Sequence, residues 1–181
     1  MTLDMKESNV LGSETERDLK GQGETLPNEL PPYVLVRDPN PYAAVGRAAG
    51  MLQPFRNFAL MPFGQVNALI IGAVNRGHYH YLLKDGQPAG FFAWAFASQE
   101  AAELWLEKKD PSLIGDGKTG DCVVFNIWHI DKSLHGDFDL QAFLIRSFRD
   151  LFADKKELLA RRVYPDGRVK PIRIKGRKLQ I

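Results

Sequence analysis

Residues 78–96 form the sequence HYHYLLKDGQPAGFFAWAF, in which two apolar and aromatic runs flank Asp85-Gly86. An Asp-Gly pair suits the positive φ values of a tight two-residue turn, so this stretch predicts a hairpin of two antiparallel strands. The second run, residues 89–97, is apolar on both faces, which is typical of a strand that is covered on both sides. We therefore expect the hairpin to lie at the centre of a sheet.

Further helices and strands are predicted on both sides of the hairpin. The helices show apolar residues at helical spacing or a good helix-forming composition, and Ser98 is a suitable N-cap. The strands are short β-branched and aromatic runs bounded by turn residues. The expected elements are helices over residues 42–52, 65–74, 99–109 and 138–152 and strands over residues 122–130, 160–164 and 168–175. Their order indicates an α+β fold, with a mixed sheet flanked by helices.

The chain is long enough for one domain and a tail. Its 181 residues, 44% of them hydrophobic, suffice for a single core. Residues 1–31 are rich in Glu, Lys, Ser, Gly and Pro, a composition that cannot bury enough surface to offset the cost of ordering. We expect a disordered tail over residues 1–31 and a single domain over residues 32–181.

Basic residues gather near the C-terminus, although the net charge is only +2. So small a net charge does not attract the whole molecule to nucleic acid or to membranes. We therefore predict no nucleic-acid partner. The basic end is either an ordinary solvated face or a docking surface for an acidic protein. From residue 161 onward a single acid, Asp166, accompanies Arg161, Arg162, Arg168, Lys170, Arg173, Lys175, Arg177 and Lys178.

The cysteine content and the N-terminal sequence indicate in which cellular compartment the protein is expected. The lone Cys122 excludes an internal disulfide and a multi-cysteine metal site, and we expect it in the core. The N-terminal sequence MTLDMKESNVLGSETERDLK has no apolar stretch of signal-peptide length, and no run of the chain is long and apolar enough to cross a membrane. We predict a cytoplasmic protein without an integral membrane segment.

Two patterns that could bind ligands are incomplete. The loop GDGKTG, residues 115–120, lacks the spacing and the strand–loop–helix context of a phosphate-binding loop, so we expect a surface loop. His78 and His80 are spaced for one face of a strand, but the sequence indicates no third ligand. We therefore predict no metal site.

Four short blocks occur in a recognisable order along the chain. They are Phe55-Arg56-Asn57, the segment from Gly86-Gln87-Pro88 to Ala93-Trp94-Ala95, Thr119-Gly120-Asp121, and Ala160-Arg161-Arg162-Val163-Tyr164-Pro165. In this order and spacing they resemble the toxin-activating lysine acyltransferases of the hemolysin C type.

This resemblance implies a GNAT-like fold and the transfer of a fatty acyl group from acyl-acyl carrier protein to lysine side chains of a secreted repeat toxin. No bound cofactor is implied, because the carrier protein delivers the acyl group as a substrate. Such chemistry needs a base for the lysine amine and hydrogen-bond donors for the carbonyl oxygen. Members of the family place a His before the Arg-Asn of the first block and an Asp in the third strand for this work.

The sequence departs from the family at both positions. Phe55 stands in the place of the His, and Ile127 falls where an ungapped alignment puts the Asp. The nearest candidate base is His129, with Asp131 two residues further along the same strand face to orient it. The alternative is that His129 is a hydrogen-bonded strand-end residue and that Asp131 caps the following turn.

The matched blocks and the basic C-terminus predict the remaining site residues. Asn57 is either a donor to the substrate carbonyl or an ordinary loop residue. The basic side chains expected to bind the substrate or the acidic carrier protein are Arg56, Arg161, Arg162, Arg173 and Lys175.

Two functions stay open at this point. One is a lysine acyltransferase whose base has moved to His129. The other is a catalytically silent GNAT-like binding module that docks an acidic protein or an acyl carrier protein. The sequence does not specify the acyl length, the target protein or the oligomeric state, a homodimer included.

Overall fold

A six-stranded sheet forms the centre of the protein, for which the computed structural model describes residues 32–108, 114–163 and 168–175. The strands follow one another in sequence order across the sheet, and every neighbouring pair is antiparallel except β4 and β5. Their bounds are β1 (Tyr33–Val36), β2 (Tyr79–Lys84), β3 (Gln87–Ala97), β4 (Cys122–Ile130), β5 (Glu157–Val163) and β6 (Val169–Lys175). The predicted α+β class with a mixed, mostly antiparallel sheet is confirmed.

The central hairpin forms as predicted. Asp85 and Gly86 have φ values of 49° and 77°, as a tight turn with two left-handed residues requires. Strand β3 pairs with β2 on one side and β4 on the other, and its residues 89–95 are buried. The hairpin therefore supplies the interior of the sheet.

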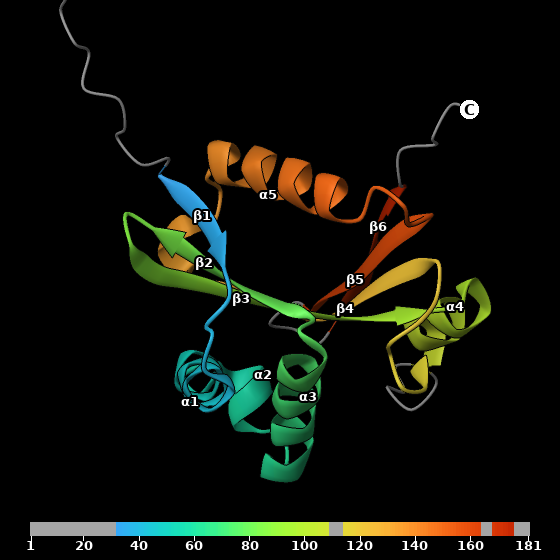
Figure 1. Ribbon diagram of the computed structural model, residues 1–181, viewed down its shortest axis with the longest axis horizontal. Helices are drawn as coiled ribbons and strands as arrows, with labels where there is room; N and C mark the ends of the chain where they lie inside the picture. The colour runs from blue at the N-terminus through green and yellow to red at the C-terminus, as the bar shows by residue number, and fades with distance from the viewer. Residues whose placement is uncertain (1–31, 109–113, 164–167, 176–181) are drawn as a thin grey trace, which may run out of the picture.

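Helices cover both faces of this sheet (Figure 1). Helices α1 (Pro41–Leu52) and α3 (Phe63–Arg76) pack on one face, where Ala48, Leu52 and Ile70 meet Tyr81 and Phe91. Helix α5 (Phe138–Leu151) crosses the other face and buries Leu140, Leu144 and Phe148. The predicted central position of β3 is thus matched by cover on both sides.

Helix α5 is fixed at its start by Asp137. The carboxylate accepts a hydrogen bond from the Leu140 backbone N–H at 2.9 Å, which caps the helix. Tyr33 of β1 donates its hydroxyl to the same carboxylate and thereby raises the pKa of Tyr33 to about 12. The edge strand is in this way tied to the helix that lies over the sheet.

Helix α4 (Gln99–Lys108) follows β3, and its predicted cap is present. The Ser98 hydroxyl accepts a hydrogen bond from the Ala101 N–H at 3.2 Å. Ala102 and Trp105 of α4 are buried against Cys122 and Val124 of β4, so the expected core position of the cysteine is confirmed.

Three element predictions need correction. Strand β1 and helix α2 (Arg56–Ala59) were not expected, because each is four residues long and too short to show a hydrophobic period. Strand β5 begins at Glu157 and not at Ala160, since Leu158 and Leu159 are buried between β4 and β6. The predicted tail over residues 1–31 lies outside the described residues.

Among the helices of the described ranges, none has the length and apolar content needed to span a membrane.

Candidate functional site

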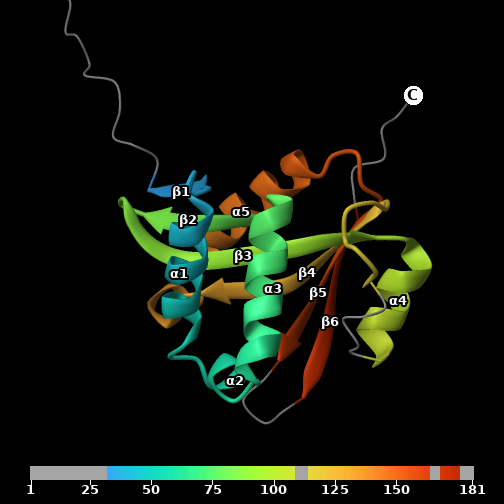
Figure 2. The same ribbon diagram turned by 60° about the horizontal axis from the view of Figure 1, so that its bottom comes forward.

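Strands β4 and β5 run side by side for only four residue pairs. The pairing begins at Cys122 with Glu157 and ends at Phe125 with Ala160. Beyond that point β4 continues along β3 while β5 continues along β6, and Figure 2 shows the two strands diverging. The sheet is therefore open at the carboxyl ends of this parallel pair.

The opening begins at an irregularity in β4. Ala93 pairs with Ile127 and Trp94 pairs with Phe125, so Asn126 is an extra residue between two ladder positions. A bulge of this kind bends the strand and redirects the side chains beside it. Asn126 lines the space between the diverging strands, where its buried Oδ1 atom has no hydrogen-bond partner.

A pocket of about 790 Å³ occupies the opening, within the roughly 300–1,000 Å³ typical of ligand sites. One wall is apolar and comes from α5 and β5, with Leu140, Leu144 and Leu158 among its residues. The other side carries polar groups from β4, the loop after β4 and α2. Of the described residues that line the pocket, none is an Asp or a Glu, and three, Lys132, Arg161 and Arg162, are cationic.

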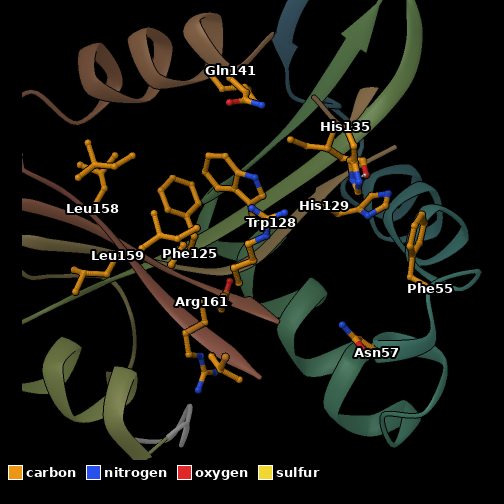
Figure 3. A pocket seen from close by; sticks show the side chains of 18 of the residues that line it. Phe55, Asn57, Phe125, Trp128, His129, His135, Gln141, Leu158, Leu159 and Arg161 are labelled. Carbon is orange, nitrogen blue, oxygen red and sulfur yellow. Dashed lines mark hydrogen bonds between the residues drawn. The ribbon is translucent and has the colours of Figure 1, made fainter. Parts of the chain in front are cut away.

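His129 lies in this pocket against Phe55, the residue in the place of the family's His. Their ring centroids are 4.0 Å apart, and Figure 3 shows the two rings next to each other, with His135 beside them. The His129 side chain comes from β4, while Phe55 precedes α2, so the candidate base and the residue in the place of the family's His meet only in the folded chain. His129 is 8% exposed.

Burial lowers the pKa of the His129 imidazole below its ordinary value of 6.5. The charge of Asp131 opposes this effect, and His135 adds to it. The lowered pKa keeps the imidazole neutral near pH 7, which is the state in which a histidine accepts a proton.

Asp131 has the capping role that was the alternative to an orienting role. Its Oδ1 atom accepts hydrogen bonds from the backbone N–H and the hydroxyl of Ser133, each at 2.8 Å, at the start of the 3₁₀ turn Lys132–Leu134. Across the described part of the chain, no hydrogen bond joins Asp131 to His129. Its influence on the imidazole is electrostatic.

Some of the other predicted site residues lie in the pocket. Asn57, Arg161 and Arg162 line it, whereas Arg56, Arg173 and Lys175 do not. The Arg161 guanidinium lies over the Trp105 ring at 4.0 Å, and its Nη1 donates to the Trp105 carbonyl oxygen at 3.5 Å. Arg161 is thus held in place from α4.

Arg173 is bound to acidic neighbours on its own surface. Its guanidinium pairs with Glu103 at 2.5 Å and with Glu157 at 3.4 Å. These contacts raise the pKa of Arg173 and lower that of Glu103. A residue so engaged is a structural link between α4, β5 and β6.

Sequence reasoning missed two pocket residues with unpaired polar atoms. They are Asn126, through Oδ1, and Trp105, through Nε1, both buried and without a partner. Asn126 could have been identified from the sequence, because its amide side chain interrupts the apolar run CVVFNIWHI. Trp105 could not have been identified in this way, because its spacing is that of an ordinary core residue of a helix.

The prediction for His78 and His80 rested on the missing third ligand. Within the described ranges, no group of three or more His, Cys, Asp or Glu side chains is placed to hold a metal ion.

Comparisons with known proteins were made for sequence and for structure. No protein of curated function matches the chain in sequence. The loading GNATL domain of CurA from Lyngbya majuscula is a similar solved structure, with 15% identity over 74% of this chain and 68% of that chain and a TM-score of 0.49. The agmatine N-acetyltransferase structure has 13% identity over 74% of this chain and 77% of that chain, with a TM-score of 0.47. For the GphF GNAT-like decarboxylase in complex with isobutyryl-CoA the identity is 14%, the coverage is 71% of this chain and 64% of that chain, and the TM-score is 0.45.

GNAT-like proteins, the class predicted from the sequence, are thus among the similar structures. The family model of the RTX toxin acyltransferases matches residues 39–164, which include the hairpin, the bulged strand and most of the residues that line the pocket. The match covers well over half of the 181 residues. The chain therefore belongs to the RTX toxin acyltransferase family.

Proposed function

We propose that the protein transfers an acyl group from the thioester of an acyl carrier protein to the ε-amino group of a lysine in a secreted repeat toxin. The observation that carries this proposal is the contact between His129 and Phe55, at 4.0 Å between ring centroids. It puts a neutral imidazole beside the position at which the family has its histidine. Family membership supplies the reaction class.

His129 acts as the base in this proposal. A lysine amine is protonated near pH 7 and must lose a proton before it attacks the thioester carbon. That first proton passes to solvent. As the neutral amine attacks, the C–N bond of the amide forms, the C–S bond breaks, and His129 takes the second proton that the nitrogen must lose. The departing thiolate receives a proton, which the imidazolium returns, so the imidazole is neutral again at the end of the cycle.

The pocket lining divides into parts that suit the parts of an acyl donor. The apolar wall of Leu140, Leu144 and Leu158 suits an acyl chain. The unpaired acceptor of Asn126 and the unpaired donor of Trp105 suit the amide groups of the carrier's prosthetic arm. Arg161 and Arg162 suit its phosphate and the acidic surface of the carrier.

The second candidate is a silent binding module, and one observation favours it. Ile127, at the position of the family's Asp, is 1% exposed and packs with α1 and α3. An apolar residue buried there takes no part in proton transfer. Such a module would keep the pocket and bind an acyl carrier protein without turnover.

An acyl-transfer assay separates the two candidates. The protein is incubated with a panel of acyl-acyl carrier proteins and a repeat toxin, and acyl-lysine is measured by mass spectrometry. We expect His129→Gln, which keeps the side-chain size but removes the base, to lose activity by about 10²–10⁴-fold. Activity that survives in His129→Gln would refute the role of His129, and absence of turnover in the wild type together with carrier binding would establish the silent module.

A rescue variant tests the position of the base. In Phe55→His combined with His129→Gln, an imidazole returns to the place that the family uses, beside the original site. We expect part of the lost activity to return, because the two rings occupy adjacent space. The matched control is Phe55→Leu in the same background, which changes packing without adding a base.

A further inference from the structure

A second group of polar side chains surrounds Trp94, and none of its members lines the acyl-transfer pocket. His80 of β2 stacks on Trp94 of β3 with ring centroids 5.4 Å apart, and His78, just before β2, stacks on it at 6.1 Å. Arg76 ends α3, and Arg37 follows β1. The group therefore brings together three parts of the chain: Arg37, residues 76–80 and Trp94.

Four atoms of this group are buried without a hydrogen-bond partner: Arg76 Nε, His78 Nδ1, His80 Nδ1 and Trp94 Nε1. About 90% or more of buried polar groups in proteins are paired, because a buried polar group without a partner destabilises the fold. They make up four of the six unpaired buried side-chain atoms found among the described residues. This concentration points to a shared partner.

The protonation of these atoms shows which kind of partner they need. Arg37 Nε donates to His80 Nε2 at 3.4 Å, so the proton of the neutral His80 ring is on Nδ1. The Nε atom of Arg76 and the Nε1 atom of Trp94 are donors only. Three of the four unpaired atoms are therefore donors, and they require an acceptor.

The surroundings favour an acceptor that carries negative charge. Burial lowers the pKa of His78, and the charges of Arg76, Arg37 and Lys155 lower it further, while a hydrogen bond with the Gly117 backbone opposes these effects. Burial also lowers the pKa of Arg76, and only the charge of Asp116 opposes this. Lys155 has a partner in Asp154 at 3.0 Å, whereas no salt bridge of Arg37 or Arg76 occurs among the residues that the structure describes.

Two glycines leave room for the Arg76 guanidinium. A Cβ atom on Gly72 would lie 3.1 Å from Arg76 Nη1, and one on Gly117 would lie 3.5 Å from Arg76 Nε. The guanidinium is therefore packed against backbone that has no side chains. Arg37 is exposed, so the group opens to solvent at that residue.

We propose that Arg37, Arg76, His80 and Trp94 form a binding site for a small oxyanion, a phosphate or a carboxylate, separate from the acyl-transfer pocket. The guanidinium groups supply charge and paired donors, and the imidazole and indole N–H groups supply two more. A bound oxyanion would link the ends of β1 and α3 to the middle of β3.

The first test is thermal unfolding of the whole protein in inorganic phosphate, in acetate, and in sodium chloride of equal ionic strength. A ligand at about ten times its dissociation constant raises Tm of a chain of this size by roughly 3–5 °C. We expect this rise with phosphate or acetate and not with chloride. A rise with only one of the two anions identifies the phosphate or the carboxylate as the ligand, and no rise with either beyond that in chloride overturns the proposal.

The second test locates the site. In a titration of the wild type with the active anion, followed by NMR of the histidine rings, we expect the His80 signals to move and those of His135 to stay. Arg76→Gln should abolish the Tm rise, whereas Arg146→Gln, on the exposed face of α5, should retain it. Unmoved His80 signals, or a rise that persists in Arg76→Gln, would place the anion elsewhere and refute the site.

Discussion

The two halves of β4 differ in their neighbours. Residues 122–125 pair with β3 on one side and β5 on the other, and all four are buried and without hydrogen-bonding side chains apart from the thiol of Cys122. Residues 127–130 pair with β3 alone, and Asn126 before them is the bulged residue; this unpaired half, residues 126–130, has no β5 neighbour and includes Asn126 and His129. Where the second neighbour is lost, the strand has free space at its edge, and polar side chains can serve a ligand there. The paired half lies in the core of the sheet, and Asn126, Trp128, His129 and Ile130 of the unpaired half line the pocket.

The largest effect should come from removing an aromatic ring of the paired half. Phe125 is 4% exposed and packs against Phe148 at 4.9 Å between ring centroids. We expect Phe125→Ala to lower the free energy of unfolding by about 3–5 kcal/mol, measured by chemical denaturation. Trp128→Ala, in the unpaired half where the ring is 38% exposed, should cost less. An equal loss in both variants would remove the distinction between the halves.

A smaller effect is expected from Asn126→Ala, and it should appear in binding. The Oδ1 atom has no partner in the protein, so its removal should leave the free energy of unfolding unchanged or slightly higher. If the amide serves the acyl donor, loss of one hydrogen bond should raise KM for the carrier by about tenfold with kcat little changed. A destabilised variant with a normal KM would make Asn126 a structural residue.

The acidity of His129 gives a pH-dependent prediction. Burial and the nearby His135 lower its pKa, while Asp131 raises it. The imidazole must be neutral to act as a base, so activity should fall only when the pH drops below 6.5 and through this lowered pKa. In Asp131→Asn the opposing charge is gone, so the acidic limb of the rate profile should move to lower pH. A limb that stays in place would show that Asp131 does not influence the base.

The same shift has a defined effect on stability. Between the lowered pKa and 6.5, the unfolded chain binds a proton that the folded His129 does not. The free energy of unfolding should therefore decrease as the pH falls through this window, and this contribution should be smaller in His129→Gln. Denaturation curves at several pH values measure it.

The smallest effect is expected at Arg173, which does not line the pocket. Its contacts with Glu103 and Glu157 lie on the surface, where an ion pair contributes about 0–1 kcal/mol. Arg173→Ala should change the free energy of unfolding by no more than this and leave KM for the carrier unchanged. A large increase in KM would support the predicted role of Arg173 in binding the carrier.

The elements that could be predicted from sequence are those with a local signal. The hairpin around Asp85-Gly86 follows from turn chemistry, and α5 follows from its hydrophobic spacing. The four residues of β1 gain their structure from pairing with β2, a contact across more than forty residues of chain that no local pattern reveals.

The site was predictable only in part for the same reason. The resemblance to the family brought attention to Phe55 and His129, but their contact depends on how α2 folds back onto β4. The bulge at Asn126 depends on the register between β3 and β4, and the position of Arg161 depends on Trp105, 56 residues away. These are tertiary facts, and they decide which side chains reach the pocket.

Gly120 shows that one of the blocks that resemble the family is explained by backbone geometry. Its φ of 138° disfavours residues with a side chain, and a Cβ atom there would overlap the backbone of Ala97 at the end of β3. The carbonyl of Gly120 also accepts a hydrogen bond from Lys155 Nζ at 3.1 Å. The Gly in the block Thr119-Gly120-Asp121 is therefore required by the close approach of the chain to the end of β3. A match to this block therefore indicates a shared path of the backbone beside β3, and it does not by itself indicate that a protein has a catalytic base.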